Sequence, residues 1–216
     1  KNLFFPEEAF LGQDWGVGEA VHLLDTMNAV DRVVIVGVHS GDRMGEFTRP
    51  GYEAYARSVV EEVKPEIDRR LRVLTSPRET GVVGSSLGGV VSFFMAWEYP
   101  EVFGYAACMS STFSHKDDLV DRVLSEPKHA SKFYLDSGWP GDNYEVTLAM
   151  AIALQSRGYI PGRDFVQLAF PARRTRSPRG AAGCTCRCSS FGERSRWRCA
   201  AGTNEPESRG EAEPSG

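Results

Sequence analysis

Apolar and polar residues follow one another along the chain in blocks that predict strands and helices in turn. Apolar runs bounded by glycine, serine or proline predict buried strands at residues 32–38, 80–84, 104–110, 132–136 and 164–170. Between most of them, apolar residues at helical spacing predict helices over residues 52–73, 90–99, 117–124 and 144–157. Pro65 should mark a break or a second start in the first helix, and Gly158 should end the last. This alternation predicts an α/β fold, a mostly parallel sheet with helices on both faces.

The overall composition limits the class of protein. The chain has 216 residues, of which 41% are hydrophobic, enough for one folded domain with a core. No run of 18 apolar residues is present, so we expect no membrane span. The net charge of −4 disfavours nucleic acid as a partner. No signal-peptide pattern follows Lys1, and we therefore expect a cytoplasmic location.

The composition changes abruptly after Pro171. Residues 1–171 hold 16 Lys and Arg against 24 Asp and Glu, whereas residues 172–216 hold 9 Arg and 5 Glu. Phe191 and Trp197 are the only large apolar side chains after Pro171. Such a segment cannot bury enough apolar surface to offset its chain entropy. We therefore predict a folded domain over 1–171 and a disordered tail over 172–216.

The link between the second predicted strand and the second predicted helix carries a reactive-serine motif. Gly84-Ser85-Ser86-Leu87-Gly88 matches G-x-S-x-G, and it has the strand-to-helix context that this motif requires. The sharp turn should strain Ser86 and lift its hydroxyl above the carboxyl edge of the sheet. It should also place the Leu87 amide at a helix N-terminus, where it can donate to an oxyanion. We predict Ser86 as a nucleophile and Leu87 as an oxyanion-hole donor; the alternative is a glycine-rich turn that only connects two elements.

A reactive serine needs a base and a carboxylate that orients the base. In hydrolases built on this motif the chain order is serine, then Asp or Glu, then histidine. The stretch after the fourth predicted strand offers Asp136, near the strand end, and Asp142, in the following loop. We favour Asp142 as the acid because a loop carboxylate can reach across to an imidazole, while Asp136 could brace the loop instead.

The histidine that should follow the last predicted strand is absent from the sequence. All four histidines, His22, His39, His115 and His129, precede the predicted acid. His39 and His115 lie in loops that could approach the site. Each of the four is otherwise an ordinary surface or loop histidine.

Several motifs together resemble those of the esterase family of α/β-hydrolases, which includes enterochelin esterase, S-formylglutathione hydrolase (esterase D) and feruloyl esterases. They are Asn2-Leu3-Phe4, Gln13–Gly16, Arg43 with Glu46-Phe47-Thr48, Lys64-Pro65 with Ile67-Asp68, and Thr80–Gly89. The resemblance spans essentially residues 1–171. It implies an α/β-hydrolase domain, Ser86 as the nucleophile, an acid from the D-S-G-x-x-x-D stretch, and a substrate-side loop at residues 43–48. It further implies a small-molecule ester as substrate and no cofactor or metal.

The chain departs from the family pattern at two places. The family carries a further strand and a His-Asp-Gly turn before the Asn-Leu-Phe segment, so the resemblance implies that early strands are missing here. The family also places Gly-x-x-His after the last strand, where this sequence has Ala172-Arg173-Arg174-Thr175. We therefore expect an esterase that is impaired as written, because its catalytic histidine is lacking.

A one-base shift of the reading frame explains the second departure. Shifted codons built across residues 171–174 permit Gly-Ala-Ala, and the next, across Arg174 and Thr175, permits His. The shifted codons from Gly183 to Phe191 fit the apolar pattern of the family's closing helix. A metal site on Cys184, Cys186 and Cys188 is the weaker alternative, because the spacing is not that of paired zinc ligands.

The sequence thus predicts a serine carboxylic-ester hydrolase that acts through an acyl-enzyme on Ser86. Two alternatives use the same scaffold. An acyltransferase would pass the acyl group from Ser86 to an alcohol or thiol. A non-catalytic binding protein would have lost the base in evolution.

Overall fold

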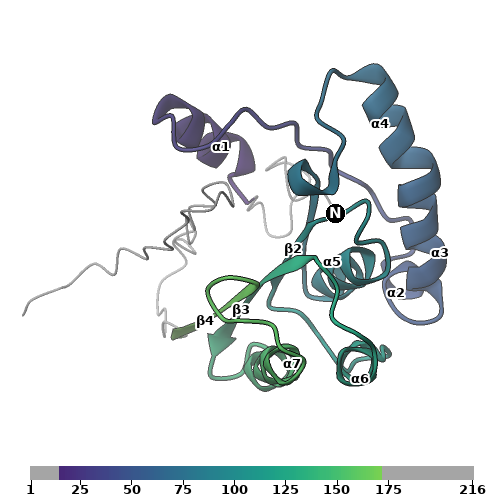
Figure 1. Ribbon diagram of the computed structural model, residues 1–216, viewed down its shortest axis with the longest axis vertical. Helices are drawn as coiled ribbons and strands as arrows, with labels where there is room; N and C mark the ends of the chain where they lie inside the picture. Colours follow the sequence, from purple (N-terminus) through teal and green to yellow (C-terminus); the bar gives the residue numbers. More distant parts are fainter. Residues whose placement is uncertain (1–14, 172–216) are drawn as a thin grey trace, which may run out of the picture. The chain divides into compact units, whose positions relative to one another are not determined.

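The computed structural model describes residues 15–171, which divide between two units at Val33 and Val34. The described part of the first unit is residues 15–33, with one helix, α1 (Val17–Thr26). None of the residues of α1 is buried. The second unit begins at Val34 and holds all the strands of the described region (Figure 1).

The second unit is built on a four-stranded parallel sheet in the order β1-β2-β3-β4. The strands are β1 (Gly81–Ser85), β2 (Tyr105–Met109), β3 (Lys132–Trp139) and β4 (Phe165–Pro171). Each connection contains one helix: α5 (Leu87–Glu98), α6 (Leu119–Ser125) and α7 (Tyr144–Ser156). The four strands predicted from residue 80 onward and the three helices between them are therefore confirmed, with ends that shift by a few residues.

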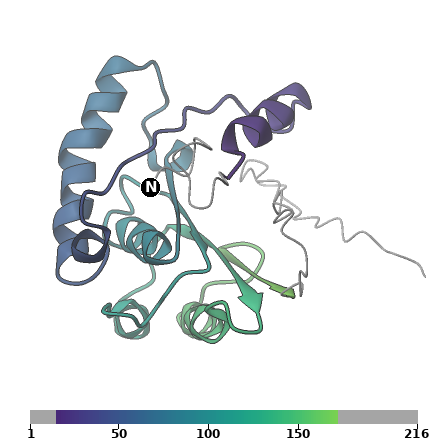
Figure 2. The ribbon, with the colours of Figure 1, turned by 180° about the vertical axis from the view of Figure 1, so that it is seen from behind.

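Burial alternates along the strands, as expected for a sheet that is packed more tightly on one face. Along β2, Ala106 and Cys108 are buried, whereas Tyr105, Ala107 and Met109 are only half-buried. Right-handed crossovers between strands that advance one position at a time put the connecting helices on a single face. Both ribbon views show α5, α6 and α7 on the same side of the sheet (Figures 1 and 2). On the other face Val83 of β1 is 56% exposed within the described region.

The first predicted strand, Arg32–Val38, is wrong. Residues 34–38 form no strand, and the apolar side chains Val34, Ile35, Val36 and Val38 are all more than 40% exposed. A β-branched run becomes a strand only where a neighbouring strand accepts and donates its backbone hydrogen bonds. Within residues 34–171, β1 pairs with β2 alone, and the run at residues 34–38 does not pair with its other edge, so its backbone forms no strand.

The predicted helix over residues 52–73 runs without a break from Gly51 to Arg70, and of the two predicted alternatives for Pro65 the second start is confirmed. It consists of α3 (Gly51–Ser58), a π-helical turn η2 (Val59–Val63) and α4 (Lys64–Arg70). Proline has no N–H, and its ring collides with the carbonyl one turn earlier in a regular α-helix. A wider π turn before Pro65 is one way to relieve that collision without ending the helix. Two short helices, α2 (Arg43–Glu46) and η3 (Pro77–Glu79), complete the unit.

The core is centred on α5, which is apolar on nearly all sides. Ten of its residues are buried, among them Phe93, Phe94 and Trp97. Phe93 stacks on Phe133 of β3, with ring centroids 4.4 Å apart, and Trp97 is fully buried. Because α5 is held on so many sides, the residue just before its first turn has a fixed place at the carboxyl end of β1.

Candidate active site

Ser86 lies between β1 and α5 in a backbone conformation that serine rarely adopts. Its φ and ψ are 59° and −123°, and its side chain is half-buried. The Ser86 N–H donates to the Met109 carbonyl at 2.9 Å, and the Ser86 carbonyl accepts from the amides of Gly89 and Val90 at 3.0 and 3.2 Å. A conformation of this kind costs free energy and persists only where its surroundings enforce it. Hydrogen bonds on both sides of Ser86 enforce it here.

Glycines make the tight turn possible, but they are not all equally constrained. A Cβ on Gly84 would collide with the Gly88 carbonyl, and one on Gly89 would collide with the Ser111 hydroxyl. A Cβ on Gly88 would meet only the Phe47 ring, at 4.0 Å. Gly84 and Gly89 therefore have no room for a side chain, while the space above Gly88 is open.

The first turn of α5 follows Ser86 directly. Leu87 begins the helix, and its side chain is buried. The first amides of a helix have no acceptor within the helix, and they carry the positive end of its dipole. The Leu87 N–H is thus available at the end of the helix that favours negative charge.

Asp142 lies at the carboxyl end of β3, in the loop that leads into α7. It is exposed, and its Oδ2 accepts hydrogen bonds from the Ser110 hydroxyl at 2.6 Å and from the Gly138 amide at 3.1 Å. Gly138 has to be a glycine or to shift, because a Cβ there would lie 3.0 Å from Asp142. These contacts use Oδ2, so the loop holds the carboxylate in place while Oδ1 can accept from another donor.

Asp136 is held in a different way. It is half-buried, and it accepts from the Ser110 amide at 3.1 Å and the Tyr134 hydroxyl at 2.9 Å. Burial raises the pKa of Asp136 above its ordinary value, with a contribution from the negative charge of Asp142 and against the effect of both hydrogen bonds. Its contacts are those of a brace between β2 and β3.

Ser110 lies between Ser86 and Asp142, and the sequence did not point to it. It follows Met109, whose carbonyl holds the Ser86 amide, and its own hydroxyl donates to Asp142. Its φ is 43°, and its carbonyl accepts from the Asn143 side chain at 2.8 Å. The sequence did carry a signal for Ser110. It follows β2, which lies between β1 and β3, and β1 and β3 lead to Ser86 and Asp142.

No described histidine completes the site. His39 and His115 are exposed, and no hydrogen bond joins either to Ser86 or Asp142 in the region from Trp15 to Pro171. His129 packs edge-on against Trp97. Trp97 follows Leu87 by ten residues on α5, which is about 15 Å along the helix at 1.5 Å per residue. His22 lies on α1, in the other unit.

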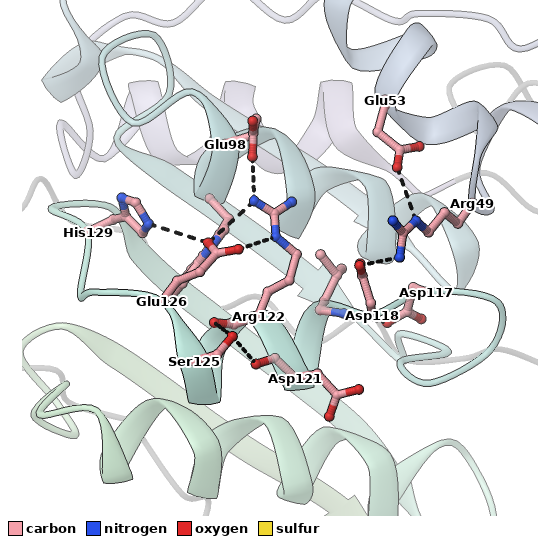
Figure 3. Close-up of polar contacts among 12 residues, drawn as sticks. Arg49, Glu53, Glu98, Asp117, Asp118, Asp121, Arg122, Ser125, Glu126 and His129 are labelled. Carbon is pink, nitrogen blue, oxygen red and sulfur yellow. Dashed lines mark hydrogen bonds and ion pairs between the residues drawn. The ribbon is translucent and has the colours of Figure 1, made fainter.

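The predicted substrate-side loop does lie beside the motif. Arg43 of α2 donates from Nη2 to the Ser85 carbonyl at 3.0 Å, and the Phe47 ring lies next to Gly88. Arg49 fastens this loop to the one that follows β2: its amide donates to the Lys116 carbonyl at 2.8 Å, and its guanidinium pairs with Asp118 (Figure 3). The loop at residues 43–48 therefore lies beside the Ser86 turn, and Arg49 connects it to the loop that follows β2.

The region 15–171 holds no cluster of three or more His, Cys, Asp or Glu side chains suited to a metal ion. The cysteines at 184, 186 and 188 lie outside the described residues, as does the predicted tail. No helix in the described region has the length and apolar character needed to cross a membrane.

Comparison with known proteins places this geometry in a family. A model of the Putative esterase family matches residues 11–198. A curated relative, the uncharacterized protein YbbA of Bacillus subtilis (strain 168), is 30% identical over 76 residues. That match covers 35% of this chain and 30% of YbbA. The chain thus matches less than a third of the length of this curated relative.

Solved structures agree with the fold. A ferulic acid esterase superimposes with a TM-score of 0.62 at 16% identity, over 73% of this chain and 70% of its own. The enterobactin esterase FES of Shigella flexneri superimposes with a TM-score of 0.58 at 15% identity, over 69% of this chain and 41% of its own. The family match covers most of the chain, and these structures share its α/β-hydrolase-like sheet. The chain therefore belongs to the Putative esterase family.

Proposed function

We propose that this protein is a carboxylic-ester hydrolase that works through an acyl-enzyme on Ser86. The observation that carries the proposal is the enforced φ of 59° at Ser86, between the parallel strand β1 and the first turn of α5. A serine in a strained strand-to-helix turn is the structural context of a hydrolase nucleophile. The chain belongs to the esterase family, for which small-molecule esters are the expected substrates. This membership supports the same reaction.

The reaction assigns one role to each group. The Ser86 hydroxyl attacks the acyl carbonyl, a histidine takes the hydroxyl proton, and the Leu87 N–H stabilises the oxyanion of the tetrahedral intermediate. The histidine then returns the proton to the leaving alcohol, and water releases the acyl group from Ser86. Asp142 orients the histidine, since it is exposed at the strand end and already fixed through Oδ2 by Ser110 and Gly138.

We propose that the histidine base is encoded after Pro171, in the shifted reading frame. We assign the esterase domain to residues 1–171 and the written residues 172–216 to out-of-frame translation. Thr175 then stands where the correct frame would encode the histidine. Removing the base of a serine hydrolase lowers the rate by about 10⁶, so the chain as written should be nearly inactive.

Two experiments test the proposal. Sequencing the source DNA across the codons for residues 165–200 should reveal a one-base lesion, and a clean single frame with no family-like alternative would refute the frame argument. The frame-restored chain should hydrolyse p-nitrophenyl acetate. Ser86→Ala should abolish this turnover, while Ser85→Ala, a matched control one residue away, should retain it. Full turnover in Ser86→Ala would refute the proposed nucleophile.

A non-catalytic binding protein is the second candidate, favoured by the absence of any imidazole hydrogen-bonded to Ser86 or Asp142 among residues 15–171. It predicts an intact reading frame and no Ser86-dependent turnover. An acyltransferase would share the Ser86 chemistry. Product analysis with an added alcohol or thiol acceptor separates it from a hydrolase.

A further inference from the structure

Arg43 is a cation held beside the proposed nucleophile without a counter-charge. Its Nη2 donates to the carbonyl of Ser85, the residue that immediately precedes Ser86, at 3.0 Å. The side chain is exposed, and none of the ion pairs formed within the described ranges involves it. A guanidinium has five N–H donors, so one contact leaves most of its capacity unused.

The carboxylates nearest to Arg43 in the sequence are engaged elsewhere. Asp42 caps α2, where its Oδ1 accepts from the Gly45 amide at 3.1 Å. Glu46 accepts a hydrogen bond from the Ser40 hydroxyl. The free donors of Arg43 are therefore not reserved for a neighbouring side chain of α2.

The loop that carries Arg43 is fixed rather than loose. The Thr48 hydroxyl donates to the Met44 carbonyl at 2.6 Å, and Thr48 is buried. Phe47 packs against Tyr55 with ring centroids 4.9 Å apart, and Arg49 is paired with Asp118 (Figure 3). A charged group on a fixed loop loses less conformational freedom when a ligand binds than one on a mobile loop.

We propose that Arg43 binds an anionic group of the substrate, so that the site prefers esters bearing a carboxylate over neutral esters of the same size. The guanidinium fork matches a carboxylate, and its fixed contact with Ser85 places that carboxylate close to the ester bond that Ser86 attacks. Phe47, beside the open space over Gly88, offers an apolar surface for the chain between the two groups. This inference rests on the proposed esterase function, whose substrate class it narrows.

A binding experiment tests the inference independently of turnover. N-(4-nitrophenyl)succinamic acid and its neutral analogue of the same size, N-(4-nitrophenyl)succinamide, are amides that the site should hold without rapid cleavage. NMR titration of the chain should give about fivefold tighter binding of the anionic amide at low salt, the upper range for an exposed ion pair. Added salt should reduce this preference because it screens the exposed charge.

Variants identify the group responsible. Arg43→Gln should remove the preference, Arg43→Lys should keep part of it, and Arg57→Gln should keep all of it. Arg57 is the matched control, an exposed arginine on α3. Equal affinity of the wild-type chain for both amides would overturn the inference, as would a preference that survives in Arg43→Gln or is lost in Arg57→Gln.

A second arm separates this inference from the proposed function. In the frame-restored chain, the kcat/KM ratio of p-nitrophenyl hemisuccinate to p-nitrophenyl acetate should fall about fivefold in Arg43→Gln. Ser86-independent hydrolysis together with an Arg43-dependent binding preference would refute the esterase proposal alone. Ser86-dependent hydrolysis without any preference at Arg43 would refute the anion site alone.

Discussion

The two ends of the sheet differ in backbone strain and in the pairing of their polar groups. At the carboxyl end, Ser86 and Ser110 have positive φ angles, and Asp142 is exposed. At the amino end, the fully buried Trp97 donates its indole N–H to Glu126 at 2.6 Å, and Arg122 bridges Glu126 and Glu98 (Figure 3). The first end holds strain and free hydrogen-bonding capacity, while the second pairs most of its polar groups.

The electrostatics of the two ends differ in the same way. Burial by itself would raise the pKa of Glu126. Hydrogen bonds from Arg122 and Trp97 nevertheless hold this pKa below its ordinary value, so the carboxylate is stabilised in its charged form. Burial instead raises the pKa of Asp136 at the carboxyl end. The surroundings therefore favour the charged form of Glu126 at the amino end and disfavour the charged form of Asp136 at the carboxyl end.

The largest expected effect distinguishes the two aspartates of the carboxyl end. In the frame-restored chain, Asp142→Asn should lower kcat for p-nitrophenyl acetate about 10⁴-fold, because the amide no longer orients the base. Asp136→Ala should mainly lower the free energy of unfolding, by about 1–3 kcal/mol, because it removes the carboxylate that accepts from the Tyr134 hydroxyl and leaves the Ser110 amide with the Asp136 carbonyl alone. Steady-state kinetics and urea unfolding of both variants check the assignment, and the reverse pattern would transfer the role of acid to Asp136.

The next effect concerns the amino end. Trp97→Ala should destabilise the protein by about 3–5 kcal/mol, because it removes a fully buried indole and leaves a cavity in the core. Trp97→Phe should cost less, since it keeps an aromatic ring against Phe93 and loses the N–H donor to Glu126 and the smaller part of the buried volume. Urea unfolding measures both changes, and a cost for Trp97→Ala below that of an exposed substitution would contradict the stabilising role.

The turn at Ser86 can be tested with two adjacent glycines. Gly89→Ala should cost about 1–3 kcal/mol, because its methyl group collides with Ser111 and the helix has to shift. Gly88→Ala is the matched control, since its methyl group meets only Phe47 at 4.0 Å and alanine favours a helix. Thermal unfolding of both variants should therefore separate them, and equal melting temperatures would show that the turn is less tightly packed than described.

The pH dependence of stability should depend on the amino end. Hydrogen bonds from Arg163 and Lys128 hold the pKa of Asp164 well below its ordinary value of 3.8, although burial acts in the opposite direction. A depressed pKa means that this carboxylate stabilises the folded state fully above the unfolded value, and that the stabilisation is lost as the pH falls toward the folded value. Asp164→Asn should cost about 1 kcal/mol at pH 7, discounted because Arg163 is exposed, and progressively less below pH 4. Urea unfolding at pH 7 and pH 3 measures the difference, and a cost that does not change with pH would contradict the ionic origin.

The smallest effect concerns the strain itself. Ser86→Gly should raise the free energy of unfolding by about 0.5 kcal/mol, because relief of a positive φ exceeds the entropy that glycine adds to the unfolded chain. Ser86→Ala keeps the Cβ and should not show this gain. Comparing the two by urea unfolding isolates the strain from the loss of the hydroxyl.

The sequence by itself determined the order and type of the elements from residue 80 to residue 171, with ends within a few residues of those observed. Each helix and strand there has its own apolar period, and each is followed by a turn residue or a break in the pattern. The G-x-S-x-G motif placed Ser86 correctly, because a strand-to-helix turn is a local feature of the backbone. The elongated helix over residues 52–73 was also local, although its π turn before Pro65 was not foreseen.

Only the tertiary structure decided what depends on a distant partner. The run at residues 32–38 has the composition of a strand, but strand formation requires a neighbour that the described sheet does not give it. Spacing could not distinguish Asp136 from Asp142, since they differ in burial and in the contact of Asp136 with the Tyr134 hydroxyl. Ser110 and Arg43 gained their places only when separate loops met at one edge of the sheet. Hydrophobic patterning encodes burial within an element, whereas hydrogen bonds between loops depend on the geometry of the whole fold.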